Sequence, residues 1–155
     1  MNIFYVDSDP TVAAKQLVDK HVVKMPLETA QLLCSAFPQG EAPYRRTHYN
    51  HPSAVWTRQS KGNYEWLINH GLALCQEYTK RYERNHSCHS IIVWCAENIN
   101  RLSFESEGFV EPPQCMPDEC KVVGDSVAAY RKYYNAHKRG MYKWKSKSPP
   151  SWACV

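Results

Sequence analysis

Residues 19–37 carry the clearest helical pattern of hydrophobic and polar positions in the chain. Apolar residues recur at steps of three and four and fall on one broad helical face: Val22, Val23, Leu27, Ala30, Leu33, Cys34 and Phe37. A polar set follows similar spacing on the opposite side: His21, Lys24, Glu28 and Gln31. The pattern predicts an amphipathic helix with one buried face and one polar stripe. Pro26 predicts a kink or a helix start within this segment.

Capping residues and the spacing of apolar residues indicate further helices along the chain. An extended segment at residues 1–6 precedes a helix at about 9–18, and later signals fall at 50–53, 62–82, 91–102 and 125–137. Gly71 in the longest of these indicates close helix packing. Prolines and acids at 103–124 favour an irregular connection. We therefore expect an all-α fold, a compact bundle of about four to five helices.

Composition limits the number of domains and the cellular setting. A chain of 155 residues with 43% hydrophobic content is long enough for one core, so we expect a single helical domain over residues 1–155. Its net charge of +4 permits an anionic partner without requiring one. No apolar run is long enough for a membrane span, and no secretory signal pattern is present. We expect a cytoplasmic protein that does not bind a membrane.

The seven cysteines raise the question of a metal site or a disulfide framework. An odd number without a secretory signal argues against disulfides. Zinc-binding residue types occur at six positions, His86, Cys88, His89, Cys95, Cys115 and Cys120. Structural zinc sites usually bring ligands in close pairs, and only Cys88 with His89, or Cys115 with Cys120, comes near that pattern. We expect no metal and no cofactor, with zinc at these residues as a minor alternative.

Residues 130–147 interleave basic and aromatic side chains. The eighteen residues contain seven cations and five aromatic rings. Lysine and arginine neutralise phosphates while rings stack on exposed bases, so the segment favours nucleic-acid binding. The alternative is a solvated helix whose tyrosines pack on the core. We expect the basic tail at residues 138–155 to bind DNA phosphates through Lys143 and Lys145, and Arg45 and Arg46 to extend the same positive surface.

The sequence Asp19-Lys20-His21, followed by Glu28 seven residues after the histidine, resembles the first long helix of the phage pyrimidine-dimer DNA glycosylases of the endonuclease V type. The segment from His51 to Tyr78 resembles the second helical region of that family. The whole chain is also similar to a group of phage and bacterial proteins that share several stretches with it: Asp-Lys-His-Val-Val-Lys, Asn-His-Pro, Asn-Tyr-x-Trp-Leu and Tyr-Arg-x-Tyr-Tyr.

The glycosylase resemblance implies an all-helical DNA enzyme whose N-terminal amine forms a Schiff base with the sugar of a damaged nucleotide, assisted by the glutamate. The chain departs from that pattern at two places. The family exposes a threonine amine after the initiator methionine is removed, whereas Asn2 is a poor context for removal, so the amine would belong to Met1. Leu27 and Gln31 stand near the positions where the family has arginines.

The leading hypothesis is a DNA glycosylase and abasic-site lyase that acts on damaged or modified bases. Glu28 would stabilise the imine or relay protons, an amine of Met1 or Lys24 would attack the sugar, and His21 completes the catalytic set. We expect DNA phosphates and a displaced base to contact nine residues: Lys20, Gln31, Arg45, Arg46, His48, His51, Trp56, Lys143 and Lys145. If the gene is phage-encoded, the protein would act in the host cytoplasm.

The alternative hypothesis is a phage protein that binds nucleic acid or counters host defence without catalysis. In that case His21, Lys24 and Glu28 would lie on an open surface. In an enzyme they should line an enclosed pocket together with His48, His51 or Trp56.

Overall fold

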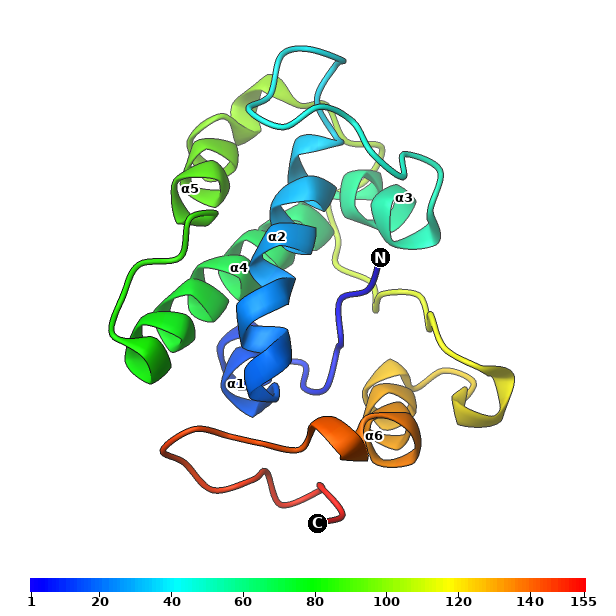
Figure 1. Cartoon of the computed structure of the whole chain (residues 1–155). Helices are drawn as coiled ribbons and strands as arrows, with labels where there is room; N and C mark the ends of the chain where they lie inside the picture. The colour runs from blue at the N-terminus through cyan, green and yellow to red at the C-terminus, as the bar shows by residue number, and fades with distance from the viewer.

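The computed structural model describes residues 1–155, and its regular structure is entirely helical (Figure 1). Six α-helices are present: α1 Pro10–Gln16, α2 Asp19–Cys34, α3 Pro52–Gln59, α4 Lys61–Tyr82, α5 His89–Glu97 and α6 Ser126–His137. Three short 3-10 helices are also present. η1 Ile99–Arg101 follows α5, η2 Asp118–Cys120 precedes α6, and η3 Arg139–Met141 follows α6. The only β pairing is an isolated bridge between Ser60 and Ser106. The expected all-α class is confirmed, with six α-helices where about four to five are predicted.

Helices α2 and α4 form the centre of the molecule. Helix α2 crosses α4, and α1, α3 and α5 also pack against α4 (Figure 1). Thirty buried hydrophobic residues from these helices, the N-terminal arm and α6 form one core cluster. Gly71 in α4 permits the close approach to α2, because a Cβ there would lie 2.8 Å from Thr29 Cγ2. None of the helices combines the length and apolar character that a bilayer crossing requires.

Side-chain caps begin several helices at the positions that the sequence indicates. Asp9 accepts hydrogen bonds from the first backbone N–H groups of α1, and Asp125 accepts one from Ala128 in α6. His51 Nδ1 accepts the N–H of Ser53 at 3.0 Å and so begins α3, with Pro52 as the first helical residue. Each cap satisfies a backbone donor that has no partner within its helix.

The buried face of α2 differs from the predicted one. Val23 and Leu27 are 44% and 40% exposed, whereas His21, placed on the polar stripe, is only 5% exposed. The N-terminal arm buries His21, because Phe4 stacks on its ring with 4.1 Å between centroids. Of the two alternatives predicted at Pro26, a kink or a helix start, the helix start is excluded, since α2 is a single helix from Asp19 to Cys34. Loss of one N–H donor at Pro26 does not end a helix that is packed along its length.

The N-terminal arm, residues 1–6, is extended and largely buried, and it runs beside α2 toward α3 (Figure 1). The side-chain amide of Asn2 holds the arm in place through both its oxygen and its nitrogen. Its Oδ1 accepts the N–H groups of Ile3 and Phe4 at 2.7 and 2.9 Å, and its Nδ2 donates to the carbonyl of Cys115 at 3.0 Å. Phe4 has φ 57°, which an L-residue rarely adopts. Such a conformation persists only where surrounding contacts hold it.

The C-terminal tail packs on the bundle. Trp144 Nε1 donates to the carbonyl of Gln16 at 2.8 Å, and Asp19 exchanges hydrogen bonds with the backbone of Lys143 and Lys145. Lys147 Nζ lies 2.8 Å from Glu77 Oε1. The tail is therefore part of the folded structure, and its exposed cations have defined positions.

Candidate functional site

A hollow of about 410 Å³ lies where the N-terminal arm, α2, the start of α3, the 103–125 connection and α6 meet. We call it the N-terminal pocket. It is lined by eleven residues: Met1, Asn2, Phe4, His21, Lys24, Met25, Glu28, His51, Cys115, Tyr133 and Lys138. All four residues of the expected catalytic set, together with His51, are among them.

The carboxylate of Glu28 faces the start of the chain. Its Oε1 accepts the backbone N–H of Asn2 at 3.0 Å and lies 3.9 Å from the amine of Met1. The side chains of Glu28 and Met1 are 14% and 3% exposed. This partial burial strengthens the attraction between a carboxylate and an ammonium group relative to bulk water. The amine and the carboxylate are thus held together at the wall of the pocket.

Lys24 offers a second amine to the same carboxylate. Its Nζ lies 3.7 Å from Glu28 Oε2, one helical turn away on α2. The side chain is 70% exposed, so this ion pair is weak and the lysine is free to change rotamer. Lys24 therefore supplies positive charge at the rim of the pocket, and its amine is less constrained than that of Met1.

His21 is a neutral hydrogen-bond donor to the pocket. Burial, with help from the charges of Lys138 and Lys24, lowers the pKa of His21 to about 3. Its Nδ1 lies 2.6 Å from the hydroxyl of Tyr134, which also accepts the N–H of Val18 at 3.4 Å. Burial raises the pKa of Tyr134 well above its usual value. The hydroxyl is therefore neutral, and because its oxygen accepts the N–H of Val18, we assign its hydrogen to the bond with Nδ1 and the imidazole hydrogen to Nε2.

His51 has the same tautomer for a different reason. Its Nδ1 accepts the N–H of Ser53, so the ring hydrogen of the neutral form is on Nε2. Burial lowers the pKa of His51, as do the N-terminal amine and His48, while Glu28 acts in the opposite direction. Two neutral imidazoles therefore line the pocket beside the amines of Met1 and Lys24 and the carboxylate of Glu28.

The other residues expected to contact DNA lie outside the N-terminal pocket. Gln31 and Arg45 line a separate hollow of about 390 Å³. Lys143 and Lys145 line another, of about 460 Å³, together with Asp19.

Four more of the expected DNA-contact residues have other surroundings. Lys20 and His48 are exposed. The Nε of Arg46 donates to the carbonyl of Phe37 at 2.8 Å. Trp56 is 4% exposed and donates to the carbonyl of Val110, so it belongs to the core.

Six residues of the N-terminal pocket are not among the site residues that the sequence analysis names: Asn2, Phe4, Met25, Cys115, Tyr133 and Lys138. Tyr133 and Lys138 belong to the basic and aromatic stretch, which sequence analysis assigns to phosphate contacts in general. Cys115 comes from the irregular connection and carries no sequence signal for this position. The side-chain amide of Asn2 donates a hydrogen bond to the carbonyl of Cys115, and these two residues, 113 positions apart, come together only in the folded chain.

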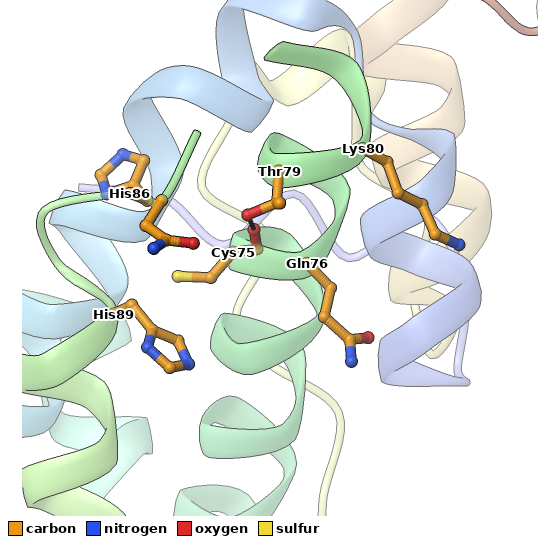
Figure 2. Close-up of a pocket in the computed structure, with 7 residues that line it drawn as sticks. Cys75, Gln76, Thr79, Lys80, His86 and His89 are labelled. Carbon is orange, nitrogen blue, oxygen red and sulfur yellow. Dashed lines mark hydrogen bonds between the residues drawn. The ribbon is translucent and has the colours of Figure 1, made fainter. Parts of the chain in front are cut away.

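A hollow of about 440 Å³ between α4 and the start of α5 offers a rival site (Figure 2). Cys75 points toward the two histidines of its rim, His86 and His89, and Lys80 points away from them. His86 is committed at both nitrogens, to the carbonyl of Val23 and to the N–H of Cys88. Burial raises the pKa of Cys75 to about 12, so its thiol is a poor nucleophile. We therefore assign the candidate active site to the N-terminal pocket.

The fold and the site define a helical protein that holds its N-terminal amine against a carboxylate of its first long helix. The sequence model of one family, described as pyrimidine dimer DNA glycosylase, matches residues 1–90. The match covers more than half of the 155 residues, and the chain belongs to this family. Membership indicates a DNA-repair glycosylase with DNA as its substrate. No curated protein and no solved structure gives a significant match to the chain.

The matched region contains Met1, His21, Lys24, Glu28 and His51, so it includes the amine, the carboxylate and both imidazoles. The remaining wall of the pocket lies beyond residue 90. It consists of Cys115 from the connection and of Tyr133 and Lys138 at α6.

Proposed function

We propose that the protein is a DNA glycosylase and abasic-site lyase that attacks damaged or modified nucleotides through the amine of Met1. The observation that carries this proposal is the 3.9 Å separation between that amine and Glu28 Oε1 inside the N-terminal pocket. An amine and a carboxylate at this spacing suit nucleophilic attack followed by proton transfer. The family match over the same residues supports it independently.

Exposure and chemistry favour Met1 over Lys24 as the nucleophile. Lys24 is 70% exposed, whereas Met1 is held at the pocket wall. As a class, α-amino groups are about 2.5 pH units less basic than lysine side chains, so a larger fraction is neutral near pH 7. An amine held at the wall of the pocket is closer to the geometry of attack than a mobile one at its rim.

The reaction begins with a nucleotide displaced from the duplex into the pocket. The neutral amine attacks C1′ of the sugar, and the C1′–N bond breaks with its electron pair going to the base, which takes a proton from water. The nitrogen then gives a proton to Glu28, and Glu28 passes this proton to O4′ as the C1′–O4′ bond opens to give a cationic imine. The Glu28 carboxylate then accepts a C2′ proton, and the C3′–O bond breaks as the phosphate leaves with its electron pair, which cleaves the strand. Hydrolysis of the imine releases the amine.

Three kinds of side chain assist these steps. The carboxylate of Glu28 accepts the proton and stabilises the cationic imine by its charge. The Nε2–H groups of His21 and His51 donate hydrogen bonds to sugar or phosphate oxygens as negative charge develops there. Lys24 and Lys138 at the pocket supply positive charge for the phosphates that flank the displaced nucleotide.

Borohydride trapping on a duplex with one abasic site tests the proposal. We expect one covalent adduct per chain, and mass spectrometry of its peptides should locate it at the α-amine. The nitrogen of Asn2 is 3.0 Å from the same carboxylate oxygen, so an amine at residue 2 would be in reach if Met1 were removed. The mass of the adduct peptide distinguishes the two cases. A screen of damaged and modified duplexes would then identify the base.

Three variants sharpen the trapping experiment. Glu28→Gln should slow adduct formation by about 10²- to 10⁴-fold, the usual contribution of a general acid or base. Lys24→Ala should still form the adduct, as should Lys80→Ala, which changes an exposed lysine of α4 outside the N-terminal pocket and serves as control. An adduct on Lys24 would move the nucleophile to the lysine. Normal DNA binding without any adduct would support the alternative of a non-catalytic binding protein.

A further inference from the structure

The chain contains a second cluster of reactive side chains, separate from the N-terminal pocket. Cys120 and Glu119 belong to η2, and His137 is the last residue of α6. One possible ligand atom from each of these residues lies within 4.8 Å of the other two. His137 Nε2 and Glu119 Oε1 lie 3.3 Å apart.

The position of Cys120 is unusual for a core residue. It is fully buried, yet it is not part of the thirty-residue core cluster. Its neighbours instead include the carboxylate of Glu119 and the imidazole of His137, each with a possible ligand atom within 4.8 Å of the sulfur. A buried thiol beside a carboxylate and an imidazole gains little from hydrophobic packing, whereas a cation bound among them would satisfy all three groups.

We propose that Glu119, Cys120 and His137 bind a zinc ion. The ligand types select the metal, because thiolate and imidazole suit Zn²⁺, whereas Ca²⁺ and Mg²⁺ require oxygen ligands. A thiolate and a carboxylate together balance the charge of Zn²⁺. Three protein ligands leave one position of a tetrahedron for water or another small ligand.

The three ligand atoms lie at most 4.8 Å apart, so to hold zinc they would approach one another by up to about 1.5 Å. With zinc–ligand bonds of about 2.0–2.3 Å, neighbouring ligand atoms in a tetrahedron lie about 3.3–3.7 Å apart. The histidine and glutamate atoms already lie 3.3 Å apart. The side chain of Glu119 is 67% exposed and is free to rotate toward the sulfur, and His137 is held in part by the ring of Tyr133, 5.6 Å away.

The site would fasten the irregular connection to α6. Long connections without regular structure gain stability from such a link, because it fixes their conformation. The link would also extend to the pocket through Tyr133. This ring contacts His137 on one side and Phe4 on the other, and the centroids of the Tyr133 and Phe4 rings are 6.1 Å apart. Zinc would therefore stabilise one wall of the N-terminal pocket without touching the substrate.

The proposed site does not use the pairs of possible ligands that are close in sequence, Cys88 with His89 and Cys115 with Cys120. Cys88 lies beside the hydroxyl of Tyr44, and Cys115 beside the hydroxyl of Ser53. Cys95 faces Cys34, with 3.6 Å between the sulfur atoms. Folding therefore gives Cys120 partners that sequence spacing does not indicate.

Titration of the chelator-treated, reduced full chain with ZnCl₂ tests the proposal. We expect one equivalent bound with a dissociation constant in the micromolar range or below, and a higher melting temperature. Co²⁺ in place of Zn²⁺ should give the absorption of a thiolate–cobalt bond. Cys120→Ser and His137→Ala should each weaken binding by about 100-fold or more, since even outer partners of metal ligands contribute 10- to 100-fold.

Matched controls separate a specific site from general metal binding. Cys154→Ser and His89→Ala remove exposed residues of the same types and should leave the affinity unchanged. Glu119→Gln alters an exposed side chain that the fold does not require, so its weaker binding would support the site even if Cys120→Ser fails to fold. No binding below about 1 mM zinc, or binding that all three ligand variants retain, would overturn the proposal.

Discussion

Replacement of Tyr134 by phenylalanine tests how the pocket controls its histidine. Tyr134 is fully buried and does not line the pocket, but its hydroxyl lies 2.6 Å from Nδ1 of His21, which does line it. The variant Tyr134→Phe removes one oxygen and keeps the ring in the core. His21 Nδ1 and the N–H of Val18 then lose their partner.

The contacts of the hydroxyl set the expected magnitudes. Loss of a buried hydroxyl that leaves two polar groups without partners should lower the free energy of unfolding by about 2–3 kcal/mol. The bond to Nδ1, with a net value of about 1–1.5 kcal/mol, favours the Nε2–H tautomer by about tenfold. Without it the opposite tautomer presents a lone pair to the pocket. Borohydride trapping should therefore slow by about threefold to tenfold, because the loss cannot exceed the tenfold preference for the Nε2–H tautomer.

Tyr142→Phe is the matched control, because Tyr142 donates to Asn135 Oδ1 at the same 2.6 Å and lies outside the pocket. Denaturant unfolding should show both variants destabilised, whereas only Tyr134→Phe should slow trapping. The ¹⁵N chemical shifts of the His21 ring report the tautomer directly. Equal trapping rates in the two variants, or an unchanged ¹⁵N pattern in Tyr134→Phe, would refute the reasoning.

Four further outcomes follow from the structure. Arg81→Ala should lower the free energy of unfolding by about 3–5 kcal/mol, because Arg81 is buried and bonds both Glu77 and Asp19, whereas exposed Arg84→Ala should change it by under about 0.5 kcal/mol. Gly71→Ala should destabilise by about 1–3 kcal/mol through its contact with Thr29 and Ile92, measured by thermal unfolding. Burial lowers the pKa of His21 to about 3 and of His70 to about 4. As pH falls below about 6.5, both histidines therefore become protonated in the unfolded chain before they do in the folded chain. Stability measured in urea should therefore decrease from about pH 6.5 to 4, by up to about 1.4 kcal/mol per pH unit for each histidine, and a flat profile would contradict both shifts. Lys143→Ala with Lys145→Ala should flatten the slope of log affinity for DNA against log salt by about one to two units while the single-turnover rate stays constant.

The part of the site carried by α2 is predictable because helix geometry is local. His21, Lys24 and Glu28 lie at steps of three and four, so any helix through them places them along one side. The capping pattern at His51 and Pro52 predicts the start of α3 for the same reason. These residues meet in one pocket because α2 and α3 pack at the same end of the molecule, where the arm runs between them (Figure 1).

The depth at which α2 is buried is not predictable from its own pattern. Val23 and Leu27 are apolar and yet exposed, because the apolar arc of α2 is wider than the surface that its neighbours cover. His21 is polar and yet buried, because Phe4 and Tyr134 pack on it from segments 17 and 113 residues away. Burial of a polar group requires a partner, and that partner is distant in sequence.

The residues beyond the family match determine what the matched residues can do. The match ends at residue 90, yet the donor that fixes the His21 tautomer is Tyr134 and the carbonyl that holds Asn2 belongs to Cys115. A chain ending near residue 90 would retain Met1, Glu28 and His21 in its sequence, but its arm would lose the bond to Cys115. Phe4 would also lose the aromatic neighbours on α6. The amine would then lack a fixed position beside the carboxylate, and α6 with its connection is as necessary to the site as the helix that bears Glu28.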